Sequence, residues 1–395
     1  MYTGKTVLLG ITGGIAAYKM CYVASGLMKQ NANVEVMMTE NACEFIAPMT
    51  FEALTKNKSH TSLFDGEDGG NIMHITLAKA ADVVLIAPAT ANVIAKLANG
   101  IADDLLTSTV LAATCHKMIA PAMNVNMFKN QVTQDNIKKL REYGWEIIEP
   151  VDGYLACGDV GTGKMQEPDV LMAYIERAIA REKDLSGKRV LVTVGATREA
   201  IDPVRFITNH SSGKMGFAVA KEAMLRGADV TVVKAFTTAR PPEFVDVIEV
   251  RSAEDMFETV KDIADGMDII IKTAAVSDYT PENVSAEKLK KGEGELSLKL
   301  KRTTDILAYL GEHKKAGQFI CGFSMETENL VENSRRKLEK KNADMIVANN
   351  LKETGAGFGT DTNKVTFITR DGDFPQELAS KEIVAKAIFD RILKK

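Results

Sequence analysis

The sequence predicts an α/β protein built from two doubly wound, parallel-sheet (Rossmann-like) domains. Apolar, β-branched runs alternate with helix-like stretches along the chain, which is typical of parallel sheets covered by helices on both faces. The opening "GKTVLLGITGG" is echoed from residue 187 by "GKRVLVTVGAT", and each run leads straight into a glycine-containing turn. With 395 residues the chain is also too long for one ordinary core, since a domain usually holds roughly 100–200 residues.

Two domains are therefore expected, at residues 1–188 and 189–395. The strand-like runs of the first are "VEVMM", "ADVVLIAP", "KMIAPAM" and "WEIIEP", and those of the second are "ADVTVVKAF", "MDIIIKTAA", "FICGFSM" and "ADMIVANN". Residues 170–186 read as a helix that ends in a charged connector. In such sheets ligands bind at the carboxyl ends of the strands, so the residues after each run are the candidates for a site.

Composition excludes several partner classes. The net charge of −4 provides no basic excess for binding nucleic acid, and no apolar run approaches the ~20 residues that a membrane span needs. The N-terminus lacks the charged and apolar regions of a signal peptide. Five scattered cysteines form neither a CxxC pair nor a metal-ligand cluster, which favours a reducing cytoplasm.

The first strand of the N-terminal half is followed by "ITGGIAAYK". Gly13 and Gly14 allow close approach of a ligand to the backbone, and a helix that opens near Ile15 offers N–H groups to an anion. A tight turn without a ligand is an equally good interpretation of this stretch alone. Thr39 ends a second strand, and Thr90 begins what reads as a long Ala-rich helix.

The stretch "YLACGDVGTGKM", residues 154–165, has the glycine and lysine spacing of a phosphate-binding P-loop from Gly158 onward. Met165 stands where the magnesium-binding hydroxyl should follow the lysine, and no β-branched strand leads into the segment. The P-loop interpretation therefore fails. What remains is either a flexible flap that carries the thiol of Cys157 to a substrate or an inert loop cysteine.

Four stretches of the first half together resemble the flavin-dependent cysteine decarboxylase family: "GITGGIAAYK", "APATANVIAKLANGIADDLL", "PAMNVNM" and "LACGDVGTGKM". They follow the family's order across residues 5–167. The resemblance implies a flavodoxin-like domain with FMN as cofactor, Cys157 as a proton donor, His74 as the active-site histidine and Asn124 as the group that holds the substrate carboxylate. It also implies cofactor contacts at Gly13, Gly14, Ile15, Thr39, Ala89, Thr90, Asn92 and Ser108.

The second half begins with a polar loop, "VTVGATREAIDPVRFITNHSSGKMGFAVAKEAM". Ser211, Ser212 and Gly213 lie at a helix start, where a phosphate is readily bound. Arg205 and Asn209 lie just upstream. So many donors are rare in a purely structural loop, because each one needs a partner or water.

With "AAVSDYTP", "EKLKK", "GFSMET" and "ADMIVANN", this half looks like the phosphopantothenate–cysteine ligases across residues 189–395. The resemblance implies transfer of CMP from CTP, with Mg²⁺, to the carboxylate of 4'-phosphopantothenate, and displacement of CMP by cysteine. It implies catalytic roles for Asn209 and Lys288, and contacts to the acid substrate from Arg205, Ser211, Ser212 and Gly213. The implied CTP contacts are Lys272, Thr273, Ala274, Asp278, Lys288, Thr304, Asp305, Ile306, Leu307, Phe323, Lys337 and Lys341. The metal ligands are not predicted.

Both halves in one chain are the arrangement of bifunctional coenzyme A biosynthesis proteins, which form 4'-phosphopantothenoylcysteine and decarboxylate it to 4'-phosphopantetheine. By resemblance we expect a homo-oligomer, with decarboxylase trimers and ligase dimers combining into a dodecamer. A NAD-dependent oxidoreductase would need a GxGxxG fingerprint, which neither half has. A non-catalytic flavin- or nucleotide-binding module remains an alternative, and it would need neither Cys157 nor Lys288. On composition alone, "EKLKKGEGE" and "RRKLEKK" would be solvated charged segments.

Overall fold

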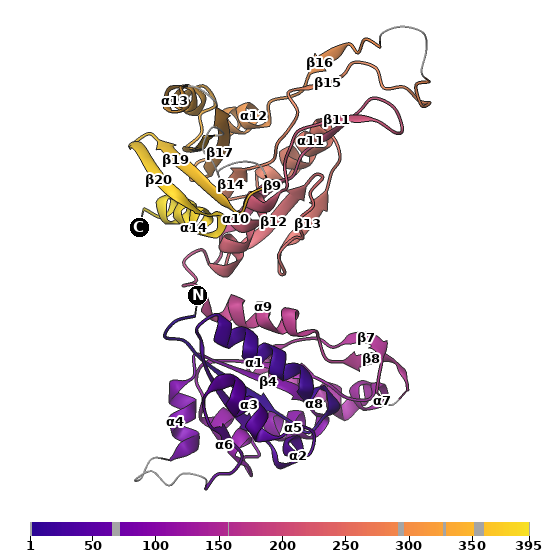
Figure 1. Ribbon diagram of the computed structural model, residues 1–395, viewed down its shortest axis with the longest axis vertical. Helices are drawn as coiled ribbons and strands as arrows, with labels where there is room; N and C mark the ends of the chain where they lie inside the picture. Colours follow the sequence, from indigo (N-terminus) through magenta and orange to yellow (C-terminus); the bar gives the residue numbers. More distant parts are fainter. Residues whose placement is uncertain are drawn as a thin grey trace. The chain divides into compact units, whose positions relative to one another are not determined.

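The computed structural model describes residues 2–64, 72–156, 158–290, 296–326, 329–350 and 359–394 (Figure 1). Its contacts divide the chain into two compact units, Met1–Arg181 and Glu182–Lys395. The expected boundary at residue 188 falls between this division and the first strand of the second unit, which begins at Arg189. Each unit consists of a sheet with helices on both faces, so the predicted α/β class is confirmed.

The first unit has a six-stranded parallel sheet in the order β3-β2-β1-β4-β5-β6. The order reverses beside β1, which places a ligand-binding crevice at the carboxyl ends of β1 and β4. The strands are β1 (Thr6–Ile11), β2 (Asn33–Met38), β3 (Ser59–His60), β4 (Val83–Ala89), β5 (His116–Pro121) and β6 (Glu146–Ile147), and a separate hairpin consists of β7 (Val151–Tyr154) and β8 (Val160–Lys164).

Alternate residues of β1 point to opposite faces of this sheet and belong to two different cores. Val7, Leu9 and Ile11 pack with α1, α3 and α9, whereas Leu8 packs with α4, α5, α6 and α8. The short 3-10 helix η1 (Ile15–Lys19) leads into α1. The helices are α1 (Met20–Lys29), α2 (Glu40–Cys43), α3 (Pro48–Thr55), α4 (Met73–Ala80), α5 (Ala91–Asn99), α6 (Leu105–Ala112), α7 (Val125–Lys129), α8 (Gln131–Glu142) and α9 (Pro168–Ile179).

The expectation of one long Ala-rich helix after Thr90 was wrong. The helix α5 ends at Asn99, because Gly100 adopts a left-handed conformation (φ 69°) that terminates it. A new helix, α6, then begins after Asp104, whose side chain accepts a hydrogen bond from the backbone N–H of Thr107 at 2.8 Å. The glycine and the aspartate in "ANGIADDLL" are the local signals for this break.

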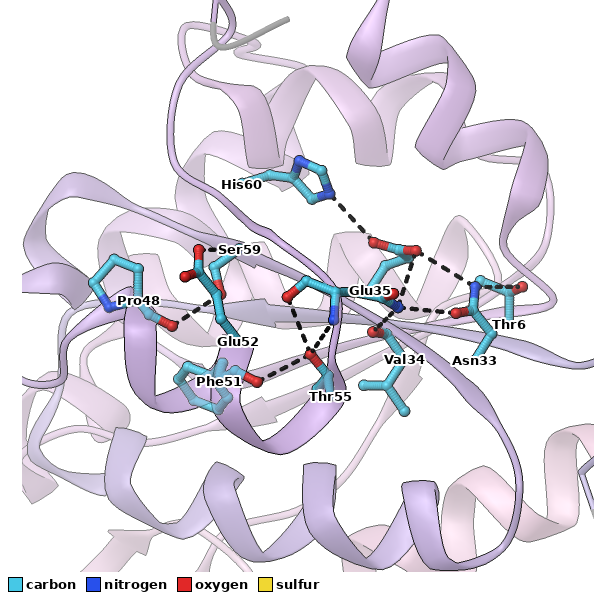
Figure 2. Close-up of polar contacts among 11 residues, drawn as sticks. Thr6, Asn33, Val34, Glu35, Pro48, Phe51, Glu52, Thr55, Ser59 and His60 are labelled. Atoms are coloured by element: carbon cyan, nitrogen blue, oxygen red, sulfur yellow. Dashed lines mark hydrogen bonds and ion pairs between the residues drawn. The ribbon is translucent and has the colours of Figure 1, made fainter.

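The two-residue edge strand β3 pairs with β2 and is also held by side chains of β2 and α3 (Figure 2). The backbone N–H of Ser59 donates to Glu52 at 3.1 Å, and the ring of His60 lies 3.2 Å from a carboxylate oxygen of Glu35 on β2. His60 is buried, and Glu35 is partly buried. These contacts give the short strand a fixed register and account for a histidine that is remote from the ligand crevice.

The second unit has an eight-stranded sheet in the order β13-β12-β9-β14-β17-β18-β19-β20. Strands β19 and β20 run antiparallel to their neighbours, and the others are parallel. The sheet strands are β9 (Arg189–Val194), β12 (Asp229–Lys234), β13 (Asp246–Glu249), β14 (Ile269–Lys272), β17 (Phe319–Glu326), β18 (Met345–Asn350), β19 (Thr362–Thr369) and β20 (Gly372–Ser380).

Two short antiparallel pairs lie apart from this sheet, β10 (Arg198–Ala200) with β11 (Phe206–Thr208) and β15 (Tyr279–Pro281) with β16 (Leu300–Arg302). In Figure 1 the β15–β16 pair forms the base of an arm that projects from the unit. Helices α11 (Ala253–Ala264), α12 (Ile306–Glu312) and α13 (Leu330–Lys340) bury side chains in one core, while α10 (Lys214–Leu225) and α14 (Lys381–Ile392) pack together.

Candidate functional site

The first unit contains a cavity of about 560 Å³ at the carboxyl ends of β1, β4 and β5. This size lies within the range of cofactor pockets. Most of its lining is apolar or backbone, with the β7–β8 hairpin forming one wall. The lining residues include Gly13, Gly14, Ile15, Tyr18, Lys19, Thr90, Met123, Asn124, Met127, Tyr154, Leu155, Lys164 and Met165.

A buried threonine joins the two strand ends that form the floor of this cavity. The hydroxyl of Thr12 donates to the carbonyl of Pro88 at 2.6 Å and accepts from the backbone N–H of Thr90 at 3.2 Å. Thr12 is fully buried, so both bonds are protected from water. The turn after β1 and the start of α5 are thereby held together, which brings Gly13, Gly14 and Thr90 to one side of the cavity.

The two glycines of this turn have different roles. A Cβ on Gly13 would lie 2.6 Å from the Cβ of Asn41, so a side chain there would displace α2. A Cβ on Gly14 would meet nothing closer than 3.7 Å, at Pro88, so Gly14 leaves open space beside the cavity. Ile15 is 61% exposed and lines the cavity as the first residue of η1.

Other residues expected at the cofactor do not line this cavity. Thr39 caps α2, its hydroxyl oxygen accepting from the N–H of Ala42 at 3.2 Å, and the hydroxyl hydrogen can still donate. Ala89 is fully buried in the sheet, and Asn92 is exposed on α5. Ser108 is partly buried on α6 and donates to the carbonyl of Ala102 at 3.3 Å.

Asn124 lies at the start of α7 and faces the hairpin. Its amide oxygen accepts from the backbone N–H of Asn126 at 2.8 Å, while its amide nitrogen donates to a carboxylate oxygen of Asp159 at 2.6 Å. Asp159 therefore presents to Asn124 the same chemical group, a carboxylate, that we expected a substrate to present. Cys157 itself lies outside the described residues, between Ala156 and Gly158.

The hairpin approaches the cavity closely because one strand carries glycine. A Cβ on Gly163 would lie 2.4 Å from the backbone oxygen of Met123, and the N–H of Met123 donates to the carbonyl of Gly163 at 3.1 Å. Met165, which replaces the hydroxyl of a P-loop, is buried in the core. The segment "VGTGK" is thus a β-strand that forms the cavity wall.

Two lysines in the cavity wall were missed in the sequence analysis. Lys19 and Lys164 both pair with Glu167, at 2.9 and 3.1 Å. Their hydrogen bonds, that of Lys19 first, lower the pKa of Glu167. The lysines occur in the matched stretches "GIAAYK" and "GTGKM", but only the fold brings them to one carboxylate. They supply positive charge to a cavity that is otherwise mostly apolar.

His74 lies on α4, directly after the undescribed residues 65–71, and does not line the cavity of its own chain. The helix α4 packs on the opposite sheet face from α1. A catalytic role for His74 would therefore need another copy of the chain or a rearrangement.

In the second unit, charged side chains gather after β14 and β17. Lys272 ends β14, Lys337 donates to the carbonyl of Phe323 at 3.1 Å, and Lys341 pairs with Asp305 at 2.7 Å. Burial of the ammonium, together with the charge of Lys337, lowers the pKa of Lys272 to about 8. Burial alone would raise the pKa of Asp305, but its bond with Lys341 helps to lower it overall. This group, Lys272, Asp305, Phe323, Lys337 and Lys341, is called the lysine cluster below.

Several neighbours expected at the nucleotide have side chains turned into the protein. Ala274, Ile306 and Leu307 are buried in the core, so only their backbone groups could contact a ligand. The hydroxyl of Thr273 donates to the carbonyl of Thr193 at 2.6 Å. These residues fix the strand end and the start of α12.

The start of α10 has the expected polar turn. Gly213 adopts a left-handed conformation (φ 74°), and a Cβ there would lie 2.3 Å from the hydroxyl oxygen of Thr237. The N–H of Gly213 donates to the hydroxyl of Ser211 at 3.3 Å, and Thr237 donates to the carbonyl of Ser212 at 2.5 Å. Asn209 is exposed and donates to the carbonyl of Ala275 at 3.3 Å.

Lys288 and Asp278 lie on the arm side of the unit, and both are exposed. The segment of Lys288 is held by its neighbour Leu289, whose N–H donates to Asp202 at 3.2 Å and whose carbonyl accepts from Arg205. The carbonyl of Asp278 accepts from the N–H of Thr303 at 3.0 Å.

A cleft of about 1230 Å³ lies between the ends of β9, β12 and β13 and the base of the arm. Its lining includes Arg205, for which we predicted a contact with the acid substrate, and Thr304, which precedes Asp305 of the lysine cluster. It also includes charged residues that the sequence analysis did not single out, among them Arg198, Glu199, Arg251, Lys301 and Arg302.

Comparisons with known proteins agree with this division. A family model described as Flavoprotein matches residues 1–180, and one described as DNA/pantothenate metabolism flavoprotein C-terminal domain matches residues 185–395. A protein of Bacillus subtilis (strain 168) named coenzyme A biosynthesis bifunctional protein CoaBC is 49% identical over 94% of this chain and 92% of its own length. The chain belongs to the CoaBC family. A family member from Vibrio cholerae is 44% identical, with 98% of each chain covered.

A crystal structure of the C-terminal domain of a CoaBC protein is 43% identical to this chain. The match covers 52% of this chain and 94% of the chain in that crystal structure, with a TM-score of 0.45. Within the described ranges, no helix is both long and apolar enough to cross a membrane. The same ranges hold no group of three or more histidine, cysteine or acidic side chains placed to bind a metal ion.

The cavity of the first unit fits a flavin mononucleotide. The open space beside Gly14 and the apolar walls from Met123, Met127 and Leu155 suit a flat ring system. Lys19 and Lys164 share the single carboxylate of Glu167, so the three side chains together keep one net positive charge for a phosphate. The residues present therefore agree with the flavoprotein family match.

Proposed function

We propose that the chain ligates cysteine to 4'-phosphopantothenate with CTP and then decarboxylates the product with FMN to give 4'-phosphopantetheine. Membership of the CoaBC family over nearly the whole chain is the observation that carries this proposal. The two candidate sites support it, since one is an apolar cavity with a cation and the other is a lysine cluster beside a charged cleft.

Decarboxylation needs an electron sink, because the amine of the substrate is tied up in an amide. When bound, FMN supplies it by accepting a hydride from the thiol-bearing carbon and returning it after carbon dioxide has left. In our proposal the turn at Gly13 to Ile15 and Thr90 hold the cofactor, and the amide of Asn124 binds the substrate carboxylate. Cys157 then donates the proton that the enethiol product requires.

The bond between Asn124 and Asp159 bears on how a substrate carboxylate is bound. The amide nitrogen of Asn124 has two N–H groups, and one of them donates to a carboxylate oxygen of Asp159. In our proposal a substrate carboxylate binds at this amide and displaces the carboxylate of Asp159, because two negative charges side by side repel each other.

His74 is expected at the same site, although it lies away from the cavity of its own chain. We propose that a neighbouring copy supplies it, in keeping with the expected decarboxylase trimer, in which FMN lies near the subunit contact. The expected ligase dimer and the dodecamer extend this assembly. The scattered cysteines remain our reason to place the enzyme in the cytoplasm.

In the ligase reaction a carboxylate oxygen of 4'-phosphopantothenate attacks the α-phosphorus of CTP, and pyrophosphate leaves. The amine of cysteine then attacks the acyl carbon, loses a proton and expels CMP. The lysine cluster and Lys288 disperse the charge that develops on the phosphates, while Asn209 holds the acyl-CMP intermediate. Mg²⁺ enters with CTP, since such ions are held largely by substrate phosphates and water.

The direct test supplies 4'-phosphopantothenate, cysteine, CTP and Mg²⁺ to the FMN-loaded chain and identifies the products by mass. We expect 4'-phosphopantetheine, carbon dioxide, CMP and pyrophosphate. No pyrophosphate release with these substrates would exclude the ligase, and protein that cannot be reconstituted with FMN would exclude the decarboxylase.

Two lysine substitutions test whether Lys288 takes part in the ligase reaction or is only a solvent-exposed side chain. We expect Lys288→Gln to lose CMP transfer while decarboxylation of added 4'-phosphopantothenoylcysteine persists. Lys290→Gln, in the same exposed segment, is the matched control and should retain both activities. An unchanged ligase rate in Lys288→Gln would remove Lys288 from the mechanism.

A further inference from the structure

The cleft of the second unit contains an arginine in close contact with two aromatic rings. The guanidinium carbon of Arg198 lies 3.2 Å from the ring centre of Phe236 and 4.3 Å from that of Phe206. A guanidinium close to aromatic rings is attracted by them but makes no hydrogen bond through that contact. The two rings thus restrict the position of Arg198 without using its N–H groups.

Within the described part of the chain, no carboxylate pairs with Arg198. Its Nε is buried without a hydrogen-bond partner, and the residue lines the cleft. Leaving a buried N–H donor of a charged group without a hydrogen bond costs free energy. The aromatic contacts do not satisfy the N–H groups, so this side chain is placed to bind an acceptor that the described residues do not provide.

The acidic residues of the cleft are mostly engaged elsewhere. Glu199 accepts from the N–H of Ala253 at 2.9 Å, and Glu249 pairs with Lys234 at 2.6 Å. Asp202 accepts from three backbone N–H groups at 2.7–3.2 Å, those of Val204, Arg205 and Leu289.

The cations of the cleft are less well matched. Among its described lining residues, Arg198, Arg251, Lys301 and Arg302 have no carboxylate partner. Three of the six acids of the lining also have no cation partner among the described residues: Glu199, Glu254 and Asp255. Glu199 and Asp255 accept from backbone N–H groups, and Glu254 is exposed on the first turn of α11. The lining has six basic and six acidic residues, so its distinguishing feature is that three arginines and a lysine are left without a carboxylate partner. Guanidinium groups of this kind bind phosphate through paired N–H donors.

The cleft also reaches the proposed nucleotide site. Thr303 and Thr304 line it, and the next residue, Asp305, belongs to the lysine cluster through its pair with Lys341. Thr303 is bonded in turn to the carbonyl of Asp278. An extended molecule with a carboxylate at one end and a phosphate at the other could thus reach the nucleotide with the first and the arginines with the second.

We propose that Arg198, aided by Arg302, binds the phosphate group of the acid substrate of the ligase. This inference rests on the proposed function. It explains why a free arginine is held in contact with two rings, and it makes this cleft the place where the ligase distinguishes a phosphorylated acid from the same acid without phosphate. Arg205 lines the same cleft, but its guanidinium already contacts Asp202 and the carbonyl of Leu289.

The test compares 4'-phosphopantothenate with pantothenate in pyrophosphate release by the full-length enzyme. For Arg198→Met, we expect kcat/KM for the phosphorylated acid to fall about 10- to 100-fold, the range for a lost charged hydrogen bond. The value for pantothenate and the KM for CTP should stay unchanged. Arg302→Gln should act in the same direction with a smaller effect, and Arg240→Met, an exposed arginine outside the cleft, should change neither value.

Each outcome decides the matter. Equal losses with both acids, or no loss with either, would overturn the assignment. A change in oligomeric state as the main effect of Arg198→Met would also overturn it, because Arg198 would then serve a subunit contact. If Arg198→Met fails to fold, Arg302→Gln decides by the same ratio. Wild-type enzyme that releases no pyrophosphate would instead remove the proposed ligase function, so the two failures are distinguishable.

Discussion

Removing the ammonium of Lys272 should stabilise the protein while weakening its binding of CTP. Burial lowers the pKa of this group from its ordinary value of 10.5 to about 8, and the charge of Lys337 adds to the effect. Asp305 and Asp278 oppose it only in part. The folded chain therefore has an unfavourable charge at neutral pH, which the triphosphate of CTP would neutralise.

The sign and size of the expected change in stability follow from proton linkage. Below pH 8 the group is charged in both states, and the folded state bears the full penalty. As pH rises from about 8 to 10.5, the folded state loses the proton first and the penalty disappears. At 1.36 kcal/mol per pKa unit the upper bound is about 3 kcal/mol. Since the side chain keeps some exposure, we expect about 1–3 kcal/mol for Lys272→Met at pH 7.

Pulse proteolysis in urea measures the free energy of unfolding of the second unit within the intact chain, because fragments of that unit can be followed by mass. Lys272→Met should gain stability at pH 7, and the gain should shrink towards pH 10. Its affinity for CTP should fall at least about tenfold, the effect of one charged contact. Lys340→Met, on the exposed face of α13, is the control and should change stability by less than about 0.5 kcal/mol. Clear destabilisation of Lys272→Met at pH 7 would refute the reasoning.

Three further substitutions test other parts of the structure. Arg226→Met leaves Glu222 buried without its partner at 2.9 Å and should lower the free energy of unfolding by about 3–5 kcal/mol. Adding Glu222→Leu should restore much of the lost stability in urea titrations. A double variant no more stable than Arg226→Met would contradict this explanation. Gly163→Ala places a Cβ 2.4 Å from the backbone oxygen of Met123, which should push the hairpin away from the cavity. The affinity for FMN, measured by fluorescence titration, should therefore drop at least about tenfold. Unaltered FMN binding would show that the hairpin does not form a wall of the cavity. Cys157→Ser should decarboxylate once and leave the flavin absorbance bleached, whereas normal turnover would remove the thiol from the mechanism.

Much of the fold could be predicted because it follows from local patterns. The apolar runs form strands in the structure. Residues that follow β1, β4 and β5, namely Gly14, Thr90 and Asn124, line one cavity. The parallel sheet accounts for this, since its carboxyl ends share one edge. The segment "VGTGK" was harder, because glycines disfavour strands and here serve a close backbone approach.

What could not be predicted depends on contacts between distant segments. Arg198 reads as one more cation in a polar loop, and only the fold brings Phe206 and Phe236 into contact with it. The pairing of Lys19 with Glu167 spans most of the first unit. The antiparallel strands β19 and β20 also carry no signal of their direction in the sequence, and the tight turn between them fixes only the direction of β20 against β19.

The buried ion network at Arg226 has a consequence for how the chain is made. Arg226 contacts Asp184, just before β9, and Asp390 on α14, so the beginning and the end of the second unit are fastened to one side chain. A ribosome must have released more than two hundred residues after Asp184 before that fastening can close. The first unit ends at residue 181, and domains generally fold as units in the order of synthesis, so we expect it to fold before the second unit, which must wait for its final helix to emerge.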